Sequence, residues 1–341
     1  MKRESTFVGW VGVGVCLMLM MFGNVDVYAE EPIKLKLSEA YTAKHYLTTH
    51  GYEVWAKKIE EATKGRVKIS VFAGSTLTKV EEAYDATVAG VCDIAMYVPA
   101  YNAARFPISD VINLPMLFPS AKVASSKAWQ LYKEFPEMKK EYADVKVLWF
   151  YCTPPYEIHT VKKAINSAAD LKGLQVRTVG PMDAKMLEIM GATPVAIPMP
   201  EAYMSLQKGV LDGIVSPFGP MRAFKTAEVT RFHTTNASLF SNLFCVVMNL
   251  KKWNSIPPEI QKIIDEVSGA SAADLFGVAF DSTTEGDLNF MKEKGDTFTT
   301  IAPDEKQKWA AAFKGIHDKW IKEVSGKGIP GEKILATVSG K

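Results

Sequence analysis

Apolar and polar residues alternate in short stretches of this chain, and stretches with a helical spacing separate them. Residues 33–37 (IKLKL) and 67–71 (VKISV) alternate, which predicts two strands. Between them, apolar positions from 52 to 62 recur at spacings of three and four, which predicts a helix that ends near Gly65. Strands and helices that alternate in this way predict an α/β fold with largely parallel sheets.

The same alternation continues along the rest of the chain. Short apolar runs predict further strands at 92–97, 145–151, 157–161, 174–178, 194–198, 213–217, 243–249 and 297–301. Helical spacing predicts helices at 79–89, 121–141, 182–190, 200–208 and 309–324.

Two stretches of the chain repeat the same order of features. Residues 86–99 and 205–218 each contain a helix end, the pattern Gly-Val-x-Asp, a strand and a proline. Gly90 and Gly209 suit the left-handed conformation that often ends a helix. The repetition favours two similarly built lobes with a ligand between them, and a chance likeness of two ordinary α/β turns is the alternative.

A long segment after residue 255 has a helical rhythm. Pro257 and Pro258 suit a first helical turn, and no proline follows up to about Lys294. One helix of that length would span about 50 Å at 1.5 Å per residue. A helix that braces both lobes explains this length, and two helices with a bend near Gly269 are the alternative.

The first residues have the pattern of an export signal. Lys2 and Arg3 precede an apolar run at 7–22, and Val27 and Ala29 are the small residues expected before a cleavage site. We therefore expect a signal peptide at residues 1–29, cleaved after Ala29, and a mature protein in the periplasm. An uncleaved membrane anchor is the alternative, but the run is short for a helix that needs roughly 20 residues to cross a bilayer.

Composition and motifs exclude several classes of function. The chain has 341 residues and a net charge of +2, which does not favour a nucleic-acid partner. Nucleophile-elbow, zinc-peptidase, P-loop and paired-cysteine zinc motifs are absent from the sequence. Cys92, Cys152 and Cys245 are odd in number and widely spaced, which does not indicate a disulfide framework. We expect a binding protein that is not an enzyme and uses no cofactor or metal.

Arg177 is the most informative single residue. It stands near the end of the predicted strand in the segment DLKGLQVRTVG at 170–180. A side chain at the carboxyl end of such a strand points toward the crevice where open α/β sheets bind ligands, so a guanidinium there predicts an anionic ligand. A surface arginine that pairs with Asp170 or Glu201 is the alternative.

Longer stretches of the sequence resemble a known family. YEIHTVKKAINSAADLKGLQVRT, at 156–178, and GATPVAIPMPEAYMSLQKGVLDGIVSP, at 191–217, are similar to the core of the solute-binding subunits of tripartite ATP-independent periplasmic (TRAP) transporters, the DctP-like family. RVKISVFAGSTL, GVCDIAMY and NLPMLF fit the same pattern. The resemblance covers essentially the whole mature chain.

This resemblance implies a two-lobed periplasmic binding protein fold with a long helix spanning both lobes. Lobe I is expected at 32–154 and 243–282, and lobe II at 155–242 and 283–336. The resemblance also implies membrane subunits of a TRAP transporter as partners, on which the closed, ligand-bound form docks. The binding subunit of an ATP-driven importer, a sensor partner and, less favoured, a periplasmic enzyme are the alternatives.

Within the family, an arginine at the place of Arg177 grips a substrate carboxylate. The resemblance further implies that Ser216 offers a polar side chain to the ligand and that Met199 packs on it. Members often carry a second basic residue about twenty positions before that arginine, but here the position is Glu157, with His159 nearby. This departure argues against a simple C4-dicarboxylate. Glu157 could accept a hydrogen bond from a ligand hydroxyl or ammonium, or hold Arg177 in place.

Aromatic residues near the expected crevice suggest the body of the ligand. Tyr41 and Tyr97 follow or end predicted strands, and each tyrosine offers an apolar face and a hydroxyl. Tyr101 and Tyr156 have similar positions, whereas Trp149 is expected in the core. We therefore expect an organic acid, a monocarboxylate with an apolar or aromatic body.

Overall fold

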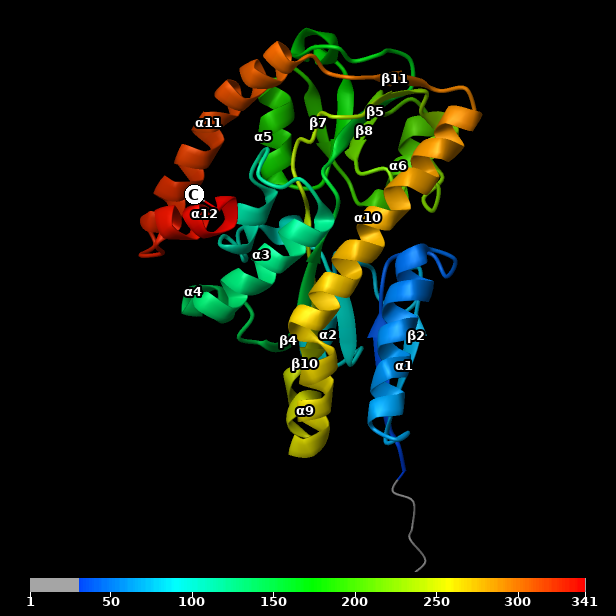
Figure 1. Cartoon of the computed structure of the whole chain (residues 1–341), viewed down its shortest axis with the longest axis vertical. Helices are drawn as coiled ribbons and strands as arrows, with labels where there is room; N and C mark the ends of the chain where they lie inside the picture. The colour runs from blue at the N-terminus through cyan, green and yellow to red at the C-terminus, as the bar shows by residue number, and fades with distance from the viewer. Residues whose placement is uncertain (1–30, 341) are drawn as a thin grey trace, which may run out of the picture. The chain divides into compact units, whose positions relative to one another are not determined.

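The computed structural model describes residues 31–340 (Figure 1). The predicted signal peptide and its cleavage site lie outside the described residues. Within residues 31–340, none of the helices combines the length and the apolar character that crossing a bilayer requires.

The first sheet has five strands in the order β2-β1-β3-β10-β4. Its strands are β1 (Ile33–Ser38), β2 (Val67–Phe72), β3 (Ile94–Tyr97), β4 (Val145–Cys152) and β10 (Leu243–Asn249). The elements that accompany it are η1 (Thr48–Tyr52), α1 (Glu53–Ala62), α2 (Ala83–Ala89), η2 (Pro99–Asn102), η3 (Ser109–Asn113), α3 (Ala121–Glu134), α4 (Pro136–Glu141) and α8 (Leu250–Asn254).

The second sheet has six strands in the order β11-β9-β5-β8-β6-β7. Its strands are β5 (Glu157–Thr160), β6 (Gln175–Thr178), β7 (Thr193–Ala196), β8 (Gly213–Ser216), β9 (Phe232–Thr234) and β11 (Thr297–Thr299). Its accompanying elements are η4 (Ala168–Leu171), α5 (Pro181–Ile189), α6 (Met199–Gln207) and α7 (Thr226–Val229). The α/β class and the two-lobed architecture expected from the sequence are confirmed, because each sheet forms the centre of one lobe.

The sheets are less uniformly parallel than the sequence predicts. β10 runs antiparallel to both β3 and β4, and β5 runs antiparallel to both β8 and β9. The other pairs, such as β1 with β2 and β6 with β7, are parallel. The physical reason is that β5 and β10 follow the two crossings of the chain between lobes, so each enters its sheet from the opposite side.

The long helical segment is broken once and contacts both lobes. α9 (Pro258–Val267) and α10 (Gly269–Glu293) are separated by Ser268, and Gly269 has φ +55, a left-handed conformation that suits glycine. The expected long helical segment that contacts both lobes is therefore confirmed, and the bend near Gly269 is present within it. α10 packs on β4 and α3 near its start, and near its end Met291 is part of the core of the second lobe (Figure 1).

The C-terminal helices also touch both lobes. α11 (Pro303–Ser325) approaches the second lobe where Glu305 accepts a hydrogen bond from the backbone N–H of Ala168, and approaches the first where Trp320 donates to the carbonyl of Pro107. α12 (Gly331–Ser339) then packs on α3. The residue boundaries drawn between the lobes from the sequence stay predictions.

Two neighbouring strands of the first sheet, β10 and β4, are almost entirely enclosed. Every residue of β10 is buried, and so are most residues of β4. Cys92, Cys152 and Cys245 are buried free thiols. Burial raises the pKa of all three thiols, so they pack as small apolar side chains.

Candidate ligand-binding site

A cavity of about 50 Å³ lies where the carboxyl ends of strands from the two sheets meet. This volume is far below the roughly 300–1,000 Å³ of typical ligand pockets, so the two lobes pack closely around it. Its walls come from both lobes and from α10. The lining residues are Ala40, Tyr41, Val80, Met96, Val98, Tyr101, Thr153, Tyr156, Arg177, Val179, Met199, Pro200, Ser216, Pro217, Pro220, Phe224, Asn242, Phe244 and Phe280.

Arg177 reaches this cavity from the third position of β6. Only 2% of the residue is exposed, and its Nε donates to the carbonyl of Ile197 at 2.9 Å. No carboxylate of the described residues lies within ion-pair distance of its guanidinium. The alternative of a surface arginine is therefore wrong, since Asp170 bonds Lys163 and the backbone of its own turn instead. A buried guanidinium without a counter-ion is costly, which makes it a strong site for an anion.

The groups around Arg177 respond to its positive charge. The guanidinium lies near enough to Tyr101 and Tyr156 to oppose the rise in pKa that burial causes in both phenols. Burial also raises the pKa of Asp183 to about 6, against the backbone N–H groups it accepts from and the charge of Arg177. The Asp183 carboxylate accepts from Val179 and Gly180, so it caps the start of α5 rather than pairing with Arg177.

Ser216 ends β8 and lines the cavity with a side chain that is 1% exposed. Its hydroxyl donates to the carbonyl of Pro217, and its own carbonyl lies 3.0 Å from Nε2 of His159. His159 is fully buried behind this strand and does not line the cavity. Its Nδ1 lies 2.9 Å from Nδ1 of His233, which in turn contacts Asp296. Burial, with the nearby His233, holds the pKa of His159 well below its usual range.

Glu157 is also placed outside the cavity. Its carboxylate accepts hydrogen bonds from the hydroxyl of Thr234 and from the backbone N–H groups of Ala237 and Ser238. These donors occupy both oxygens, so the carboxylate fixes the chain after β9 and does not contact Arg177. Burial raises the pKa of Glu157, while the three donors oppose that rise. Glu157 is therefore not positioned to contact a ligand in this cavity.

Tyr97 and its neighbours show which side of β3 faces the ligand. Met96 and Val98 line the cavity, and the intervening Tyr97 points to the other face of the sheet. There its ring packs against Tyr84 and Phe106 in the core of the first lobe. The structure therefore does not bring Tyr97 to the cavity, because successive side chains of a strand point to opposite faces. Tyr101, four residues later, takes the place that Tyr97 was expected to fill.

Tyr41 and Met199 both line the cavity, one from each lobe. The Tyr41 ring stacks on His45 with 4.3 Å between ring centroids, and its hydroxyl accepts from Tyr151 at 3.4 Å. Tyr151 in turn lies 2.8 Å from Tyr52, so the cavity wall continues into a buried chain of phenols. Met199 begins α6 and presents a flexible apolar side chain, which adapts to irregular shapes.

Several lining residues were not singled out from the sequence. Phe224, Phe244 and Phe280 add three aromatic rings to the walls. Thr153 and Asn242 stand at the two crossings of the chain between the lobes. These five residues meet in the cavity wall only because distant segments of the chain come together, and no local sequence pattern marks any of them.

Glu39, next to the cavity residues Ala40 and Tyr41, predicts a pH-dependent stability. This residue is 2% exposed, and burial raises the pKa of its carboxyl to about 8. The folded state favours the protonated form of Glu39. The stability that the protonated Glu39 contributes is therefore complete below pH 4.5 and is lost as the pH rises through about 8. The glutamine in Glu39→Gln cannot ionise. We expect this variant to melt about 5 °C above the wild type at pH 8 and close to it at pH 4.5.

Melting curves of both proteins at the two pH values measure this effect. The substituted glutamine can still accept from the backbone of Tyr41 and bond Thr48, the two present partners of Glu39. Glu81→Gln, at an exposed position, serves as the control. At each of the two pH values it should melt at the same temperature as the wild type. An equal gain for Glu39→Gln at both pH values would contradict ionisation as the cause.

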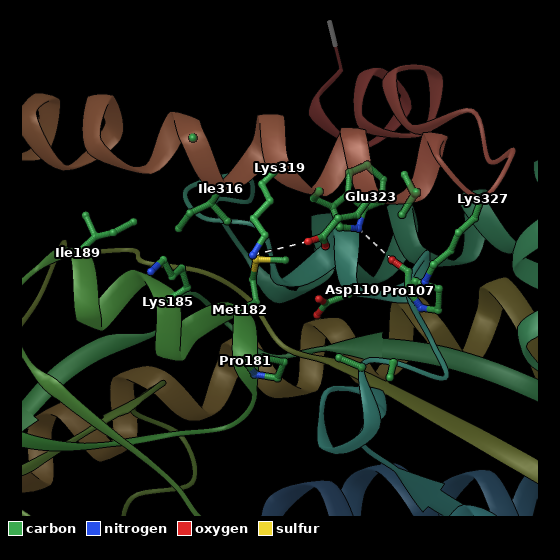
Figure 2. Close-up of a pocket in the computed structure, with 15 residues that line it drawn as sticks. Pro107, Asp110, Pro181, Met182, Lys185, Ile189, Ile316, Lys319, Glu323 and Lys327 are labelled. Atoms are coloured by element: carbon green, nitrogen blue, oxygen red, sulfur yellow. Dashed lines mark hydrogen bonds and ion pairs between the residues drawn. The ribbon is translucent and has the colours of Figure 1, made fainter.

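A larger cavity, of about 480 Å³, lies between α11, α5 and the segment 103–110 (Figure 2). Its lysines stand at the rim, where Lys319 pairs with Glu323, while the Asp110 carboxyl lies deeper in the groove. The pKa of Asp110 is raised to about 6, mainly by burial and also by the nearby Asp183 and Glu323, while the hydrogen bond from Asn113 opposes the rise. These carboxyl groups oppose an anion, so the smaller cavity at Arg177 is the better candidate site for an organic acid.

Comparison with known sequences identifies the family of this chain. A family model described as "DctP: Bacterial extracellular solute-binding protein, family 7" matches residues 38–323. The C4-dicarboxylate-binding periplasmic protein DctP of Rhodobacter capsulatus is 25% identical, over 89% of this chain and 91% of that protein. The 2,3-diketo-L-gulonate-binding periplasmic protein YiaO of Escherichia coli is 27% identical, over 81% of this chain and 85% of that protein.

Solved structures agree with the sequence relatives. A TRAP solute-binding protein of an unidentified marine microbe, specific for aromatic acids and bound to 3-hydroxybenzoate, has a TM-score of 0.87 at 30% identity, covering 91% of this chain and 98% of that one. One from Rhodoferax ferrireducens with benzoate has a TM-score of 0.86 at 27% identity, covering 90% and 97%. The expected class of non-enzymatic binding protein is thereby confirmed. The chain belongs to the DctP family of periplasmic solute-binding proteins of TRAP transporters.

Proposed function

We propose that this protein captures an organic acid with a single carboxylate and an apolar or aromatic body, and that Arg177 binds the carboxylate between the lobes. The observation that carries this proposal is the charge of the cavity. Arg177 is the one charged side chain among the described residues that line it. A guanidinium matches a carboxylate with two parallel hydrogen bonds, and the pair is neutral when it is enclosed.

A second carboxylate on the ligand would find no cation in this cavity. The other polar groups that line it are hydroxyls and an amide: Tyr41, Tyr101, Thr153, Tyr156, Ser216 and Asn242. Burial of an unpaired charge is far more costly than burial of a ring, so the cavity disfavours a dicarboxylate. We therefore infer a monocarboxylate, and propose Ser216 as a polar contact and Met199 and Tyr41 as packing contacts.

The solved relatives support an acid with an aromatic body. The structures described above hold benzoate and 3-hydroxybenzoate, and a relative from Bordetella bronchiseptica, 26% identical, holds both enantiomers of mandelate. In this chain the rings of Phe224, Phe244 and Phe280 supply an aromatic wall of the kind that such a ligand requires.

The enclosed cavity implies that the lobes separate to admit the ligand and close on it. Closure gains free energy only from contacts that exist in the closed form, which here are the Arg177 pair and the walls from the first lobe. The closed form then docks on the membrane subunits of a TRAP transporter. We further propose export to the periplasm with cleavage after Ala29.

A thermal-shift series tests the proposal directly. Benzoate, 3-hydroxybenzoate, phenylacetate and mandelate are compared with succinate as a dicarboxylate and with benzamide as a neutral control. At least one monocarboxylate should raise the melting temperature by several degrees at saturation, because a ligand stabilises the state that binds it. Stabilisation by succinate alone, or by benzamide as strongly as by benzoate, would contradict the proposal.

A further inference from the structure

Asn242 leaves one buried hydrogen-bonding atom without a partner in the wall of the cavity. Only 2% of the residue is exposed, and it lines the space between the lobes. Its Oδ1 has no hydrogen-bond partner among the described residues. A buried polar atom of this kind costs free energy, so such an atom in a ligand cavity indicates a partner on the ligand.

The backbone of Asn242 is held firmly in place. Its N–H donates to the hydroxyl of Thr153 at 2.9 Å, and its carbonyl accepts from the N–H of Thr153 at 3.0 Å. These reciprocal bonds join the two crossings of the chain between the lobes. The backbone from which the Asn242 side chain projects is therefore held in place before a ligand arrives, which favours specific recognition.

The amide of Asn242 lies beside Tyr156. It is close enough to the phenol to oppose the rise in pKa that burial causes in Tyr156, and its Oδ1 has no hydrogen-bond partner among the described residues. The ring of Tyr156 is stacked on Phe240 with 4.2 Å between centroids, which holds the phenol in place. Tyr156 also lies near Arg177, so the amide and the guanidinium flank the same phenol.

Other buried atoms without partners do not face the cavity. The hydroxyls of Ser241 and Thr178 also lack partners, but neither residue is part of the cavity wall. Glu157, which the sequence suggested as an acceptor for a ligand hydroxyl, is occupied by three donors of the second lobe. Among the described residues that line the cavity, Asn242 thus carries the buried side-chain atom that lacks a hydrogen-bond partner.

We infer that Asn242 Oδ1 accepts a hydrogen bond from a donor on the body of the ligand, and that the preferred ligand is an organic acid with a hydroxyl or amino substituent. This inference rests on the proposed function, because it concerns the same cavity. Arg177 selects the carboxylate and Asn242 selects the donor. An acid without a donor would leave Oδ1 unpaired, and a site built for a hydrogen bond discriminates strongly against such an analogue.

Matched pairs of acids test the inference by isothermal titration calorimetry. The 2-, 3- and 4-hydroxy forms of benzoate and phenylacetate are each compared with the corresponding fluoro acid, which is similar in size and donates no hydrogen bond. In at least one pair the wild type should bind the hydroxy acid about tenfold or more tightly. This comparison needs no variant, so a misfolded mutant does not prevent the test.

Asn242→Leu then assigns the preference to the amide. The ratio of the two affinities should fall to about one in Asn242→Leu, since leucine is of similar size and has no acceptor. Ser241→Ala is the matched control, because it removes a neighbouring unpaired atom outside the cavity, and it should keep the wild-type ratio. Acids that bind with no hydroxy preference, or a preference that survives in Asn242→Leu, would overturn the inference alone. If no acid binds the wild type, the proposed function fails and the inference fails with it.

Discussion

Replacing Arg177 with alanine is expected to weaken binding of the preferred monocarboxylate about 100-fold or more. Removing one partner of an enclosed charge pair costs several kcal/mol, since the other charge is left buried without compensation. Calorimetry with the acid that stabilises the wild type most, among benzoate, 3-hydroxybenzoate, phenylacetate and mandelate, measures the loss. The unliganded variant should fold, because the Arg177 side chain makes a single hydrogen bond with the described residues, from Nε to Ile197, and the backbone pairing of β6 does not depend on the side chain.

Two further variants separate geometry from charge. Arg177→Lys keeps the positive charge but loses the planar fork, so we expect an intermediate loss of about tenfold. Arg105→Ala, which removes a partly exposed arginine paired with Asp85 and Asp144 in the first lobe, should bind as the wild type does. Unchanged affinity in Arg177→Ala would contradict the proposed role of the guanidinium.

Gly180→Ala is expected to weaken binding about tenfold to 100-fold by obstructing the approach of the lobes. Gly180, at the start of α5, faces Ala100 of the first lobe, and a Cβ on it would lie 2.6 Å from the Ala100 carbonyl oxygen. Backbone atoms cannot swing aside, so the lobes must shift apart. Val179 and Tyr101, the neighbours of these two residues, both line the cavity, and the shift would reach the ligand directly.

Affinity and shape together test this effect. Gly180 has φ −152, an extended conformation that alanine adopts without strain, so the melting temperature of the unliganded protein should change little. Small-angle scattering with saturating acid should show a larger radius of gyration for Gly180→Ala than for the wild type. Gly315→Ala is the control, because a Cβ at Gly315 has no atom within 4 Å. Wild-type affinity and radius in Gly180→Ala would show that the close contact at Ala100 does not limit closure.

The sequence predicts the position of Arg177 because a local pattern carries it. A short strand followed by Val179 and Gly180 and then a helix places the arginine at the edge of the sheet where ligands bind. Ser216 ends β8 in the same way, and β6 and β8 are neighbours in the sheet. Both residues line one cavity, so strand ends were sufficient to find this wall of the site.

Other features of the site depend on information that the sequence does not carry. All four residues of β3 and all four of β5 are buried. An alternation of exposed polar and buried apolar residues is therefore missing, and nothing in the pattern shows which face of these strands meets the ligand. Tyr97 was expected at the cavity as a tyrosine at a strand end and His159 as a neighbour of Glu157, but Met96 lines the cavity and His159 is buried on β5 beside Ser216. A strand enclosed on both faces reads as a continuous apolar run.

The remaining features arise from contacts between distant segments. β9 has three residues, which is too few to show a periodic pattern in the sequence. The backbone N–H groups of Ala237 and Ser238, which follow this strand, donate to the carboxylate of Glu157. Asn242 and Phe280 reach the cavity only because the chain returns to the first lobe and α10 then runs across both lobes. Loops and crossings of this kind are placed by tertiary packing rather than by local propensity.

A crystal structure of the wild type with 3-hydroxybenzoate would show directly which group binds the carboxylate. We expect the acid to lie between the two sheets, with both carboxylate oxygens about 2.7–2.9 Å from nitrogens of Arg177. An acid bound with its carboxylate turned away from Arg177, or seated in the groove between α5 and α11, would contradict this expectation.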